Sequence, residues 1–349
     1  MDKKQKKRLH VSGTKFPSEL RSNTISNDWV IIATGRGKKP ATFKKEKRKK
    51  IIPPKSNCPF CNIDKIGKTC LIFAKGRKIH GNKIPHNWTT IVIPNKYPAL
   101  IPSCSLNEKA DGFFRTMDGV GYHEVVVFHD HQKSFALFSV EELEEVITAY
   151  QDRYLELMEK SFTKYISIFH NHGQDAGASI FHPHSQILAV PVMDPDLNLA
   201  ISNSKKYFEQ NKKCVYCGMN EWEQDKKERI VFENKEFLVL CPFVSKSAFE
   251  MIITPKKHMH CFERINGTEK LHLAVALKEA LFRLYKALND PPYNFYIHTS
   301  PVNSGNYDFY HWHLTILPKT ATWAGFELST GIEISTIEPE KAAEYLRKQ

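Results

Sequence analysis

The sequence predicts an α+β fold built from two similar halves in tandem. The main observation is that one order of segments occurs twice, over roughly 100 residues each: a Cys-x-x-Cys pair, β-rich strands, a long amphipathic helix and a His-x-His motif beside a strand. At 349 residues, the chain is also long enough for two domains. We expect a basic, disordered tail at 1–20, a catalytic half at 21–195 and a supporting half at 196–349.

The first half begins with a segment typical of a β-hairpin. Residues 21–36 read RSNTISNDWVIIATGR, in which an Asn-Asp turn precedes a β-rich run. Further strands are predicted at 88–99, 121–128 and 165–169. Between the last two, a Ser-x-x-Glu capping box opens a helix predicted at 139–160, with apolar residues at helical spacing along one face.

The second half repeats these elements after a polar segment, 192–213, that we expect to be a linker. Strands are predicted on both sides of one long helix, in the order found in the first half. The predicted strands are 229–232, 237–243, 248–258, 293–298 and 311–318, and the predicted helix is 268–288.

The composition combines hydrophobic cores with a strong positive charge. Hydrophobic residues make up 41% of the chain, and the formal net charge is +12. No apolar run approaches the ~20 residues of a membrane-spanning helix, and the N-terminus lacks a secretory signal, so we expect a cytoplasmic protein with no membrane partner. Basic residues concentrate at 3–8 and 38–50, which indicates solvated loops or, alternatively, attraction of phosphate groups.

Four of the eight cysteines form two Cys-x-x-Cys pairs, which in a cytosolic chain are more typical of metal sites than of disulfides. Each half also carries two histidines at equivalent places. Two thiolates and two imidazoles suit tetrahedral zinc, so we predict one or two structural zinc ions; the alternative is that a pair is reduced and unmetallated. The predicted ligands are Cys58, Cys61, His131 and His182 in the first site and Cys214, Cys217, His258 and His311 in the second, where His298 is a rival.

Residues 169–186, FHNHGQDAGASIFHPHSQ, have the design of a reactive site. His182 and His184 are two apart in an extended segment, so they can share one face, and the proline between them fixes the backbone. We predict that the metal holds His182 while His184 acts as the nucleophile, because a neutral imidazole attacks phosphorus well and also leaves well.

Polar side chains next to His184 are candidates for phosphate binding. Ser179 and Gln186 can donate to non-bridging oxygens, as can the backbone amides of the glycine-rich turn. His313 is the counterpart of His184 in the second half. Its surroundings lack the glycines and the Ser-Gln pair, so we expect one active half and one supporting half.

With these motifs in view, the chain resembles the galactose-1-phosphate uridylyltransferase family, within the histidine-triad superfamily, over residues 19–347. The motifs are RSNTISNDWVIIATGR, CPFC, VIPNKYPAL, HEVVVFHDH, FHNHGQDAGASIFHPHSQ, HWH and AGFELSTG. The resemblance implies two open, antiparallel half-barrels with outer helices, usually in a homodimer. It also implies ping-pong transfer of a nucleoside monophosphate between a nucleotide sugar and a hexose 1-phosphate, with UDP-glucose and galactose 1-phosphate as the first expectation.

The resemblance also assigns roles to residues. It implies that His184 becomes nucleotidylated and that Gln186 and Ser179 bind the phosphates. The other substrate contacts it implies are Arg36 near the phosphates, Asn95, Phe169 and Asn171 around the nucleoside, and Phe326 and Glu327 at the hexose, from this chain or from a partner subunit.

Three alternatives stay open. The second Cys-x-x-Cys and AGFELSTG look like the ADP-glucose phosphorylase branch of the family, and Lys96 stands where an acidic residue commonly meets the ribose in the uridylyl branch, so the base is uracil or adenine. Water could also resolve the covalent intermediate, as in a hydrolase. A zinc-dependent nucleic-acid-binding module is a different class suggested by the charge, although the His-x-His motifs lie outside zinc-finger spacing.

Overall fold

The structure is a computed structural model that describes residues 18–33, 35, 40–44, 52–63, 68–81, 83–302 and 305–349. These residues form an α+β fold, as expected. The strands are β1 (Glu19–Ser22), β2 (Trp29–Ile32), β3 (Leu71–Ala74), β4 (Arg77–Lys78), β5 (Thr90–Pro94), β6 (Lys109–Asp111), β7 (Phe114–Thr116), β8 (Tyr122–Phe128), β9 (Tyr165–His172), β10 (His184–Val190), β11 (Ile230–Glu233), β12 (Phe237–Leu240), β13 (Met251–Pro255), β14 (Tyr293–His298), β15 (His313–Pro318) and β16 (Glu333–Ser335). The helices are α1 (Val140–Met158), α2 (Pro195–Asn211), α3 (Val215–Lys226), α4 (Gly267–Leu288), α5 (Gly325–Thr330) and α6 (Pro339–Arg347).

The two halves share one 11-stranded sheet. From its centre, the N-terminal half runs β9-β10-β8-β5-β3-β4 and the C-terminal half runs β14-β15-β13-β12-β11, so the predicted repeat of strand order is confirmed. The halves join where β9 pairs antiparallel with β14, from Tyr293↔His172 to Tyr296↔Phe169. The sheet is open in the described part of the chain, and no barrel closes there.

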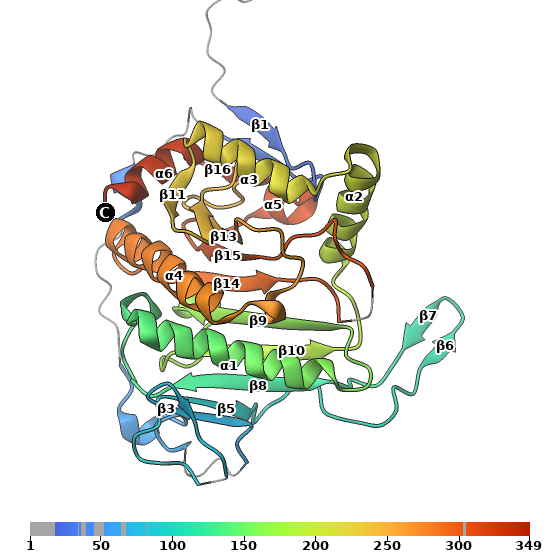
Figure 1. Cartoon of the computed structure of the whole chain (residues 1–349), viewed down its shortest axis with the longest axis vertical. Helices are drawn as coiled ribbons and strands as arrows, with labels where there is room; N and C mark the ends of the chain where they lie inside the picture. Colours follow the sequence, from blue (N-terminus) through green and yellow to red (C-terminus); the bar gives the residue numbers. More distant parts are fainter. Residues whose placement is uncertain are drawn as a thin grey trace, which may run out of the picture.

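One face of the sheet is covered by α1 and α4, which pack side by side across the junction between the halves (Figure 1). Both helices begin with a capping box, Ser139 with Glu142 in α1 and Asn266 with Glu269 in α4. Apolar residues at helical spacing, such as Leu143, Ile147 and Leu277, are buried in the largest hydrophobic cluster. This core holds the central strands in place beneath the His-x-His segments.

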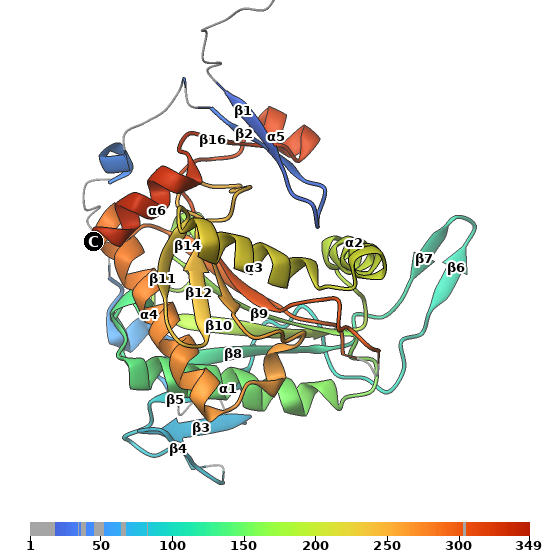
Figure 2. The same ribbon diagram turned by 45° about the horizontal axis from the view of Figure 1, so that its top comes forward.

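The segment 192–213, which we expected to be a linker, connects the two halves through a helix. It contains α2, whose N-terminus has two ordinary start signals: the Asp194 side chain accepts from the Asp196 amide at 2.9 Å, and Pro195 occupies the first turn. Only Leu197 and Ser204 are buried, so the apolar pattern is too weak to reveal the helix in the sequence. Together, α2 and α3 lie next to the C-terminal half of the sheet (Figure 2).

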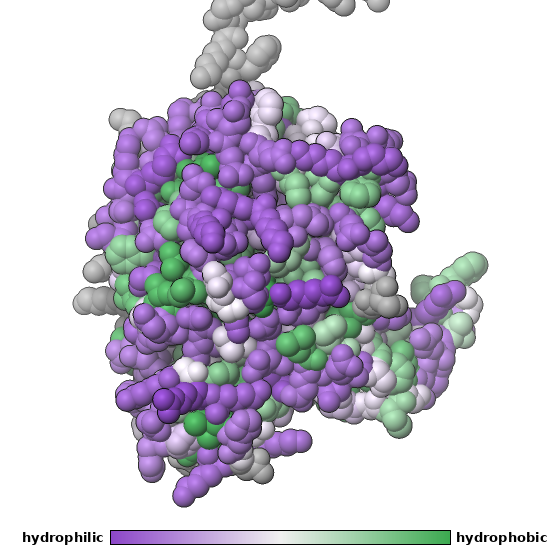
Figure 3. Space-filling model, in the orientation of Figure 1, coloured by the Kyte–Doolittle hydropathy of each residue, from purple (hydrophilic) through white to green (hydrophobic). Residues whose placement is uncertain are grey.

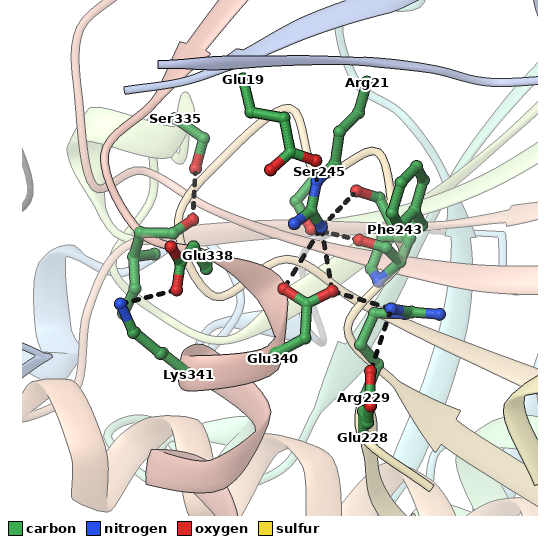
Figure 4. A network of polar contacts seen from close by, with 12 residues as sticks. Glu19, Arg21, Glu228, Arg229, Phe243, Ser245, Ser335, Glu338, Glu340 and Lys341 are labelled. Carbon is green, nitrogen blue, oxygen red and sulfur yellow. Dashed lines mark hydrogen bonds and ion pairs between the residues drawn. The ribbon is translucent and has the colours of Figure 1, made fainter. Parts of the chain in front are cut away.

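A second, three-stranded sheet joins the two ends of the described chain. The hairpin β1–β2 pairs antiparallel, and β16 adds parallel to β2. Beneath it, the buried Arg21 guanidinium lies 3.0 Å from the Glu340 carboxylate of α6, which also bonds Arg229 at 2.7 Å (Figure 4). This ion-pair network fastens the N-terminal hairpin to the C-terminal helix.

A hairpin arm, residues 99–120, projects from the N-terminal half and carries β6 and β7 at its end (Figure 1). Its tip is hydrophobic: Phe113 is fully exposed, and Phe114 is 75% exposed (Figure 3). Among the described helices, none combines the length and the apolar character needed to cross a bilayer.

Candidate functional site

The first predicted metal cluster comes together at the end of β8 and the start of β10. The sulfurs of Cys58 and Cys61 and the Nδ1 atoms of His131 and His182 all lie within 4.8 Å of one another. The Cys61 sulfur is 3.2 Å from His131 Nδ1, and the Cys58 sulfur is 3.5 Å from His182 Nδ1. A tetrahedral zinc site with these donors has ligand-to-ligand distances of about 3.3–3.8 Å, so the four atoms fit the ion.

The outer nitrogens of the two imidazoles also fit a metal site. His182 Nε2 lies 2.5 Å from the Phe128 carbonyl, and His131 Nε2 lies 2.9 Å from the Pro53 carbonyl. These carbonyls accept an N–H from each ring, which leaves both Nδ1 atoms unprotonated and aimed at the sulfurs. The backbone therefore fixes the tautomer that a metal requires.

The second cluster repeats this arrangement between α3 and the end of β13. Cys214, Cys217, His258 and His311 lie within 4.8 Å of one another, and Cys217 is 3.3 Å from His258 Nδ1. His311 Nε2 meets the Pro255 carbonyl at 3.0 Å, as His182 meets Phe128. A hydrogen bond from the Cys217 thiol holds the pKa of the Cys214 thiol far below its usual value, which favours the thiolate that binds metal.

His298, the rival ligand, is not part of this cluster. Its ring packs instead against that of His313, with the centroids 4.8 Å apart and the planes tilted by 31°, and the Tyr216 ring centroid lies 5.8 Å from that of His313. Loss of hydration, with a second contribution from His298, lowers the pKa of His313 to about 3. The counterpart of His184 is therefore half-buried, with the rings of His298 and Tyr216 next to it.

His184 occupies the first position of β10, buried beside the first metal cluster. Its Nδ1 lies 2.8 Å from the His182 carbonyl, which accepts the Nδ1 proton and leaves Nε2 with a lone pair. Burial lowers the pKa of His184, so the ring is neutral near pH 7. The Phe60 ring, held between the two cysteines of the first pair, packs against it at 5.1 Å.

The glycine-rich turn lies between β9 and β10. Gly173 and Gly177 have φ of +81° and +86°, and a Cβ at Gly173 would lie 3.1 Å from Pro292, so glycine is required for both conformation and contact. The turn leaves Ser179 exposed. Beside it, residues of both halves, including Asp175, Lys319 and Trp323, line a cavity of about 380 Å³.

Asn171 and Phe169 lie on the site face of β9, next to the turn. Asn294 of β14 donates from Nδ2 to Asn171 Oδ1 at 2.7 Å and to the Ala176 carbonyl at 2.8 Å. The Asn171 Nδ2 group therefore points away from Asn294 and toward the glycine turn. A Cβ atom added to Gly177 would lie 3.9 Å from this nitrogen. Phe169 pairs with Gln186 in the ladder between β9 and β10.

Asn95 follows β5, and its neighbour on the same face is His123 of β8. The Asn95 amide nitrogen is 3.0 Å from His123 Nε2, and that ring nitrogen is 2.8 Å from Gln186 Oε1. The structure thus brings together Asn95, Phe169, Asn171, His184 and Gln186.

Three further predicted residues are not part of this group. Arg36 lies outside the described residues. Phe326 and Glu327 are on α5, which lies on the C-terminal half beside β16, whereas β10 belongs to the other half (Figure 1). Phe326 is 45% exposed, and Glu327 accepts from the Ala324 amide at 3.0 Å.

Comparison with known families matches both halves. Models of the N-terminal and C-terminal domains of galactose-1-phosphate uridyl transferase match residues 10–194 and 200–348. The chain belongs to the galactose-1-phosphate uridylyltransferase family. The resemblance found in the sequence is thereby confirmed, and the chain is a member of a family of nucleotidyltransferases.

Individual members of the galactose-1-phosphate uridylyltransferase family align over nearly the whole chain. ADP-glucose phosphorylase of Arabidopsis thaliana is 33% identical, over 95% of this chain and 92% of its own length. Galactose-1-phosphate uridylyltransferase of Thermotoga maritima is 30% identical, over 95% of this chain and 98% of its own. The crystal structure of an Arabidopsis ADP-glucose phosphorylase with bound ADP-glucose has a TM-score of 0.79 at 29% identity, covering 95% of this chain and 99% of that one.

Three residues of the site were not identified from the sequence. Phe60 lies inside the Cys-x-x-Cys pair, and the spacing of the cysteines does not indicate that its ring packs against His184. His123 lies in the predicted strand 121–128, and no motif in the sequence links it to Gln186. Asn294 comes from the half predicted to be supporting, and only the pairing of β9 with β14 brings it to Asn171.

Proposed function

We propose that this chain is a cytoplasmic UDP-glucose–hexose-1-phosphate uridylyltransferase, with galactose 1-phosphate as the hexose phosphate, that works through a uridylylated His184. The observation that supports it most is the geometry of His184 within a chain matched over both halves by the family models. A neutral imidazole with a free Nε2, beside a glycine turn and an amide side chain, suits attack on a phosphate.

In the first step, the Nε2 lone pair forms a bond to the α-phosphorus of the nucleotide sugar. The bond from that phosphorus to the bridging oxygen breaks, and glucose 1-phosphate leaves with the electron pair. In the second step, a phosphate oxygen of the acceptor forms a bond to the same phosphorus, the bond from phosphorus to Nε2 breaks, and Nε2 recovers its lone pair. No net proton transfer is needed, and donors such as Gln186 and Ser179 would stabilise the charge on the non-bridging oxygens.

The role proposed for metal is structural. Zinc bound at the first cluster would hold His182, and through the backbone of the His-Pro-His segment it would hold His184 in place. A second zinc at Cys214, Cys217, His258 and His311 would do the same for the His-x-His segment of the C-terminal half.

We also propose that the chain forms a homodimer in which α5 of one subunit approaches the active site of the other. Phe326 and Leu328 are exposed on α5, and within one chain that helix lies apart from β10. A partner subunit would supply the hexose contacts expected of Phe326 and Glu327.

A second candidate is adenylyl transfer from ADP-glucose to inorganic phosphate. It is favoured by the 33% identity to the ADP-glucose phosphorylase of Arabidopsis thaliana. The same His184 chemistry would serve, with a different base pocket and a smaller acceptor.

Intact-mass spectrometry after incubation with each nucleotide sugar tests both candidates. We expect UDP-glucose to add one uridylyl group that is lost in His184→Ala and retained in His313→Ala, the matched change in the other half. Label from ADP-glucose alone would favour the second candidate. Wild-type protein that takes no label from either sugar would exclude both.

A further inference from the structure

His123 contacts the phosphate-binding candidate Gln186 from the neighbouring strand. On β8, His123 and Val125 point to the same face, and Val125 pairs with Gln186 across the ladder. The His123 ring is half-buried, and its Nε2 lies 2.8 Å from Gln186 Oε1. Neither the metal clusters nor the proposed steps at His184 use this histidine.

The backbone sets the tautomer of His123. The Ala99 amide N–H donates to Nδ1 of the ring at 3.1 Å, so Nδ1 carries no proton in this arrangement. In a neutral imidazole, the proton is then on Nε2. His123 therefore donates from Nε2, and the atom it reaches is Gln186 Oε1.

This bond determines which end of the Gln186 amide faces the active site. A glutamine side chain can present either an oxygen or an NH₂ group, and only the NH₂ group can stabilise a phosphate oxygen. With Oε1 held by His123, the Nε2 hydrogens are directed elsewhere. No group in the described part of the chain bonds this nitrogen, so it is available to a ligand.

Asn95 is oriented in a similar way. The Tyr97 amide donates to Asn95 Oδ1 at 2.9 Å, which turns the Asn95 NH₂ group toward His123, 3.0 Å from Nε2. Because that ring nitrogen carries its own proton, the Asn95 amide nitrogen cannot donate to it. Two NH₂ groups, one from Asn95 and one from Gln186, are thus presented on the face that holds His184.

We propose that His123 is a positioning residue for nucleotidyl transfer, which keeps the Gln186 NH₂ group aimed at the phosphate being transferred. The inference rests on the proposed function, since it needs a phosphate at His184. Without the bond from His123, the Gln186 amide can turn, and its oxygen would then repel the phosphate for part of the time. We expect the loss to fall on the rate of nucleotidylation more than on substrate affinity, because the transition state carries more charge to stabilise.

Two substitutions separate the two hydrogen bonds of His123. In His123→Asn, the side-chain oxygen can still accept from Ala99, but no donor reaches Gln186. In His123→Gln, the longer side chain places an NH₂ group near the position of the ring Nε2, so a donor remains. We expect His123→Asn to slow nucleotidylation of His184 about tenfold, and His123→Gln to restore most of the rate. Thermal unfolding of each variant identifies any loss that comes from folding alone.

A double-mutant cycle with Gln186→Ala is the decisive measurement. If His123 acts through Gln186, then His123→Asn should have little further effect on labelling once Gln186 is alanine. The inference would be overturned if the losses of labelling rate from the two single substitutions added in full in the double variant. It would also be overturned if His123→Asn were labelled at the rate of the wild type. If the wild type takes no label, the proposed function itself fails, and the inference falls with it.

The tautomer of the His123 ring can be measured without an activity assay. Nitrogen-15 NMR of labelled histidine should show His123 protonated at Nε2 and unprotonated at Nδ1 in the free protein, with the signal assigned by its loss in His123→Gln. A ring protonated at Nδ1 instead would overturn the orientation argued here.

Discussion

Asn294 in the C-terminal half donates a hydrogen bond of 2.7 Å to the side-chain oxygen of Asn171 in the N-terminal half. The two residues pair directly across β9 and β14. Asn171 follows Phe169 on the strand that leads into the glycine turn before His184. The second half thus supplies a side chain to the site of the first, while the His184 counterpart in its own His-x-His segment, His313, packs next to His298 and Tyr216.

Asn294→Ala should slow nucleotidylation of His184 by about tenfold, because Asn171 Oδ1 and the Ala176 carbonyl both lose their donor and the turn before Ser179 loosens. The measurement is the rate of mass gain with the labelling nucleotide sugar. Asn211→Ala, on an exposed face of α2, is the control and should keep the wild-type rate. An unchanged rate in Asn294→Ala would show that Asn171 is oriented without it.

Cys58→Ser and Cys214→Ser should separate the two metal clusters. We expect elemental analysis to find two zinc ions in the wild type and one in each variant, because each substitution removes one of four ligands. Labelling of His184 should be lost in Cys58→Ser, whose cluster holds His182, and retained in Cys214→Ser. Equal loss of labelling in the two variants would contradict a local role for the first cluster.

Glu340→Gln should lower the free energy of unfolding by about 1–3 kcal/mol, since Arg21 and Arg229 are both buried and would lose a charged partner. Arg229 keeps a second partner in Glu223, at 2.9 Å, which limits the effect. Thermal denaturation measures the change. The control is Glu344→Gln on the same helix, an exposed residue whose one ion-pair partner among the described residues is Lys348, which should leave the midpoint nearly unchanged.

Glu250 should make stability fall as the pH rises. Burial raises the pKa of its carboxyl group to about 7 in the folded protein, from a usual value near 4.5. The folded state therefore binds the proton more tightly, and its advantage is lost between about pH 4.5 and pH 7. Glu250→Gln lacks this titration, so its stability relative to the wild type should increase from pH 5 to pH 8, by about 1–3 kcal/mol. A constant difference in midpoint across this range would contradict the raised pKa.

Much of the fold could be predicted because its signals are local. The capping box at Ser139, the apolar strand 121–128 and the repeated Cys-x-x-Cys and His-x-His motifs each depend on residues close in sequence. The repeat then gave the correspondence of β8 with β13 and of β5 with β12, which the strand order confirms.

The features that could not be predicted depend on tertiary contacts. α2 buries little apolar surface, so its helical period is faint in the sequence. The contact from Asn294 to Asn171 requires the pairing of β9 with β14, and that pairing has no signature within either strand. The bond from His123 to Gln186 likewise depends on the register between β8 and β10. Motifs point to the reacting residue, but not to the side chains that orient its neighbours.

The antiparallel pairing of β9 with β14 has a consequence for any attempt to divide this protein into its two halves. Each fragment would expose a strand edge at which the four residues of the β9–β14 ladder, including Phe169 or Phe295, have lost their partners. Such edges recruit other strands, so separately produced fragments should aggregate or reassemble with each other rather than persist alone. Two fragments made together in one cell would be the arrangement with the best prospect of rebuilding the site.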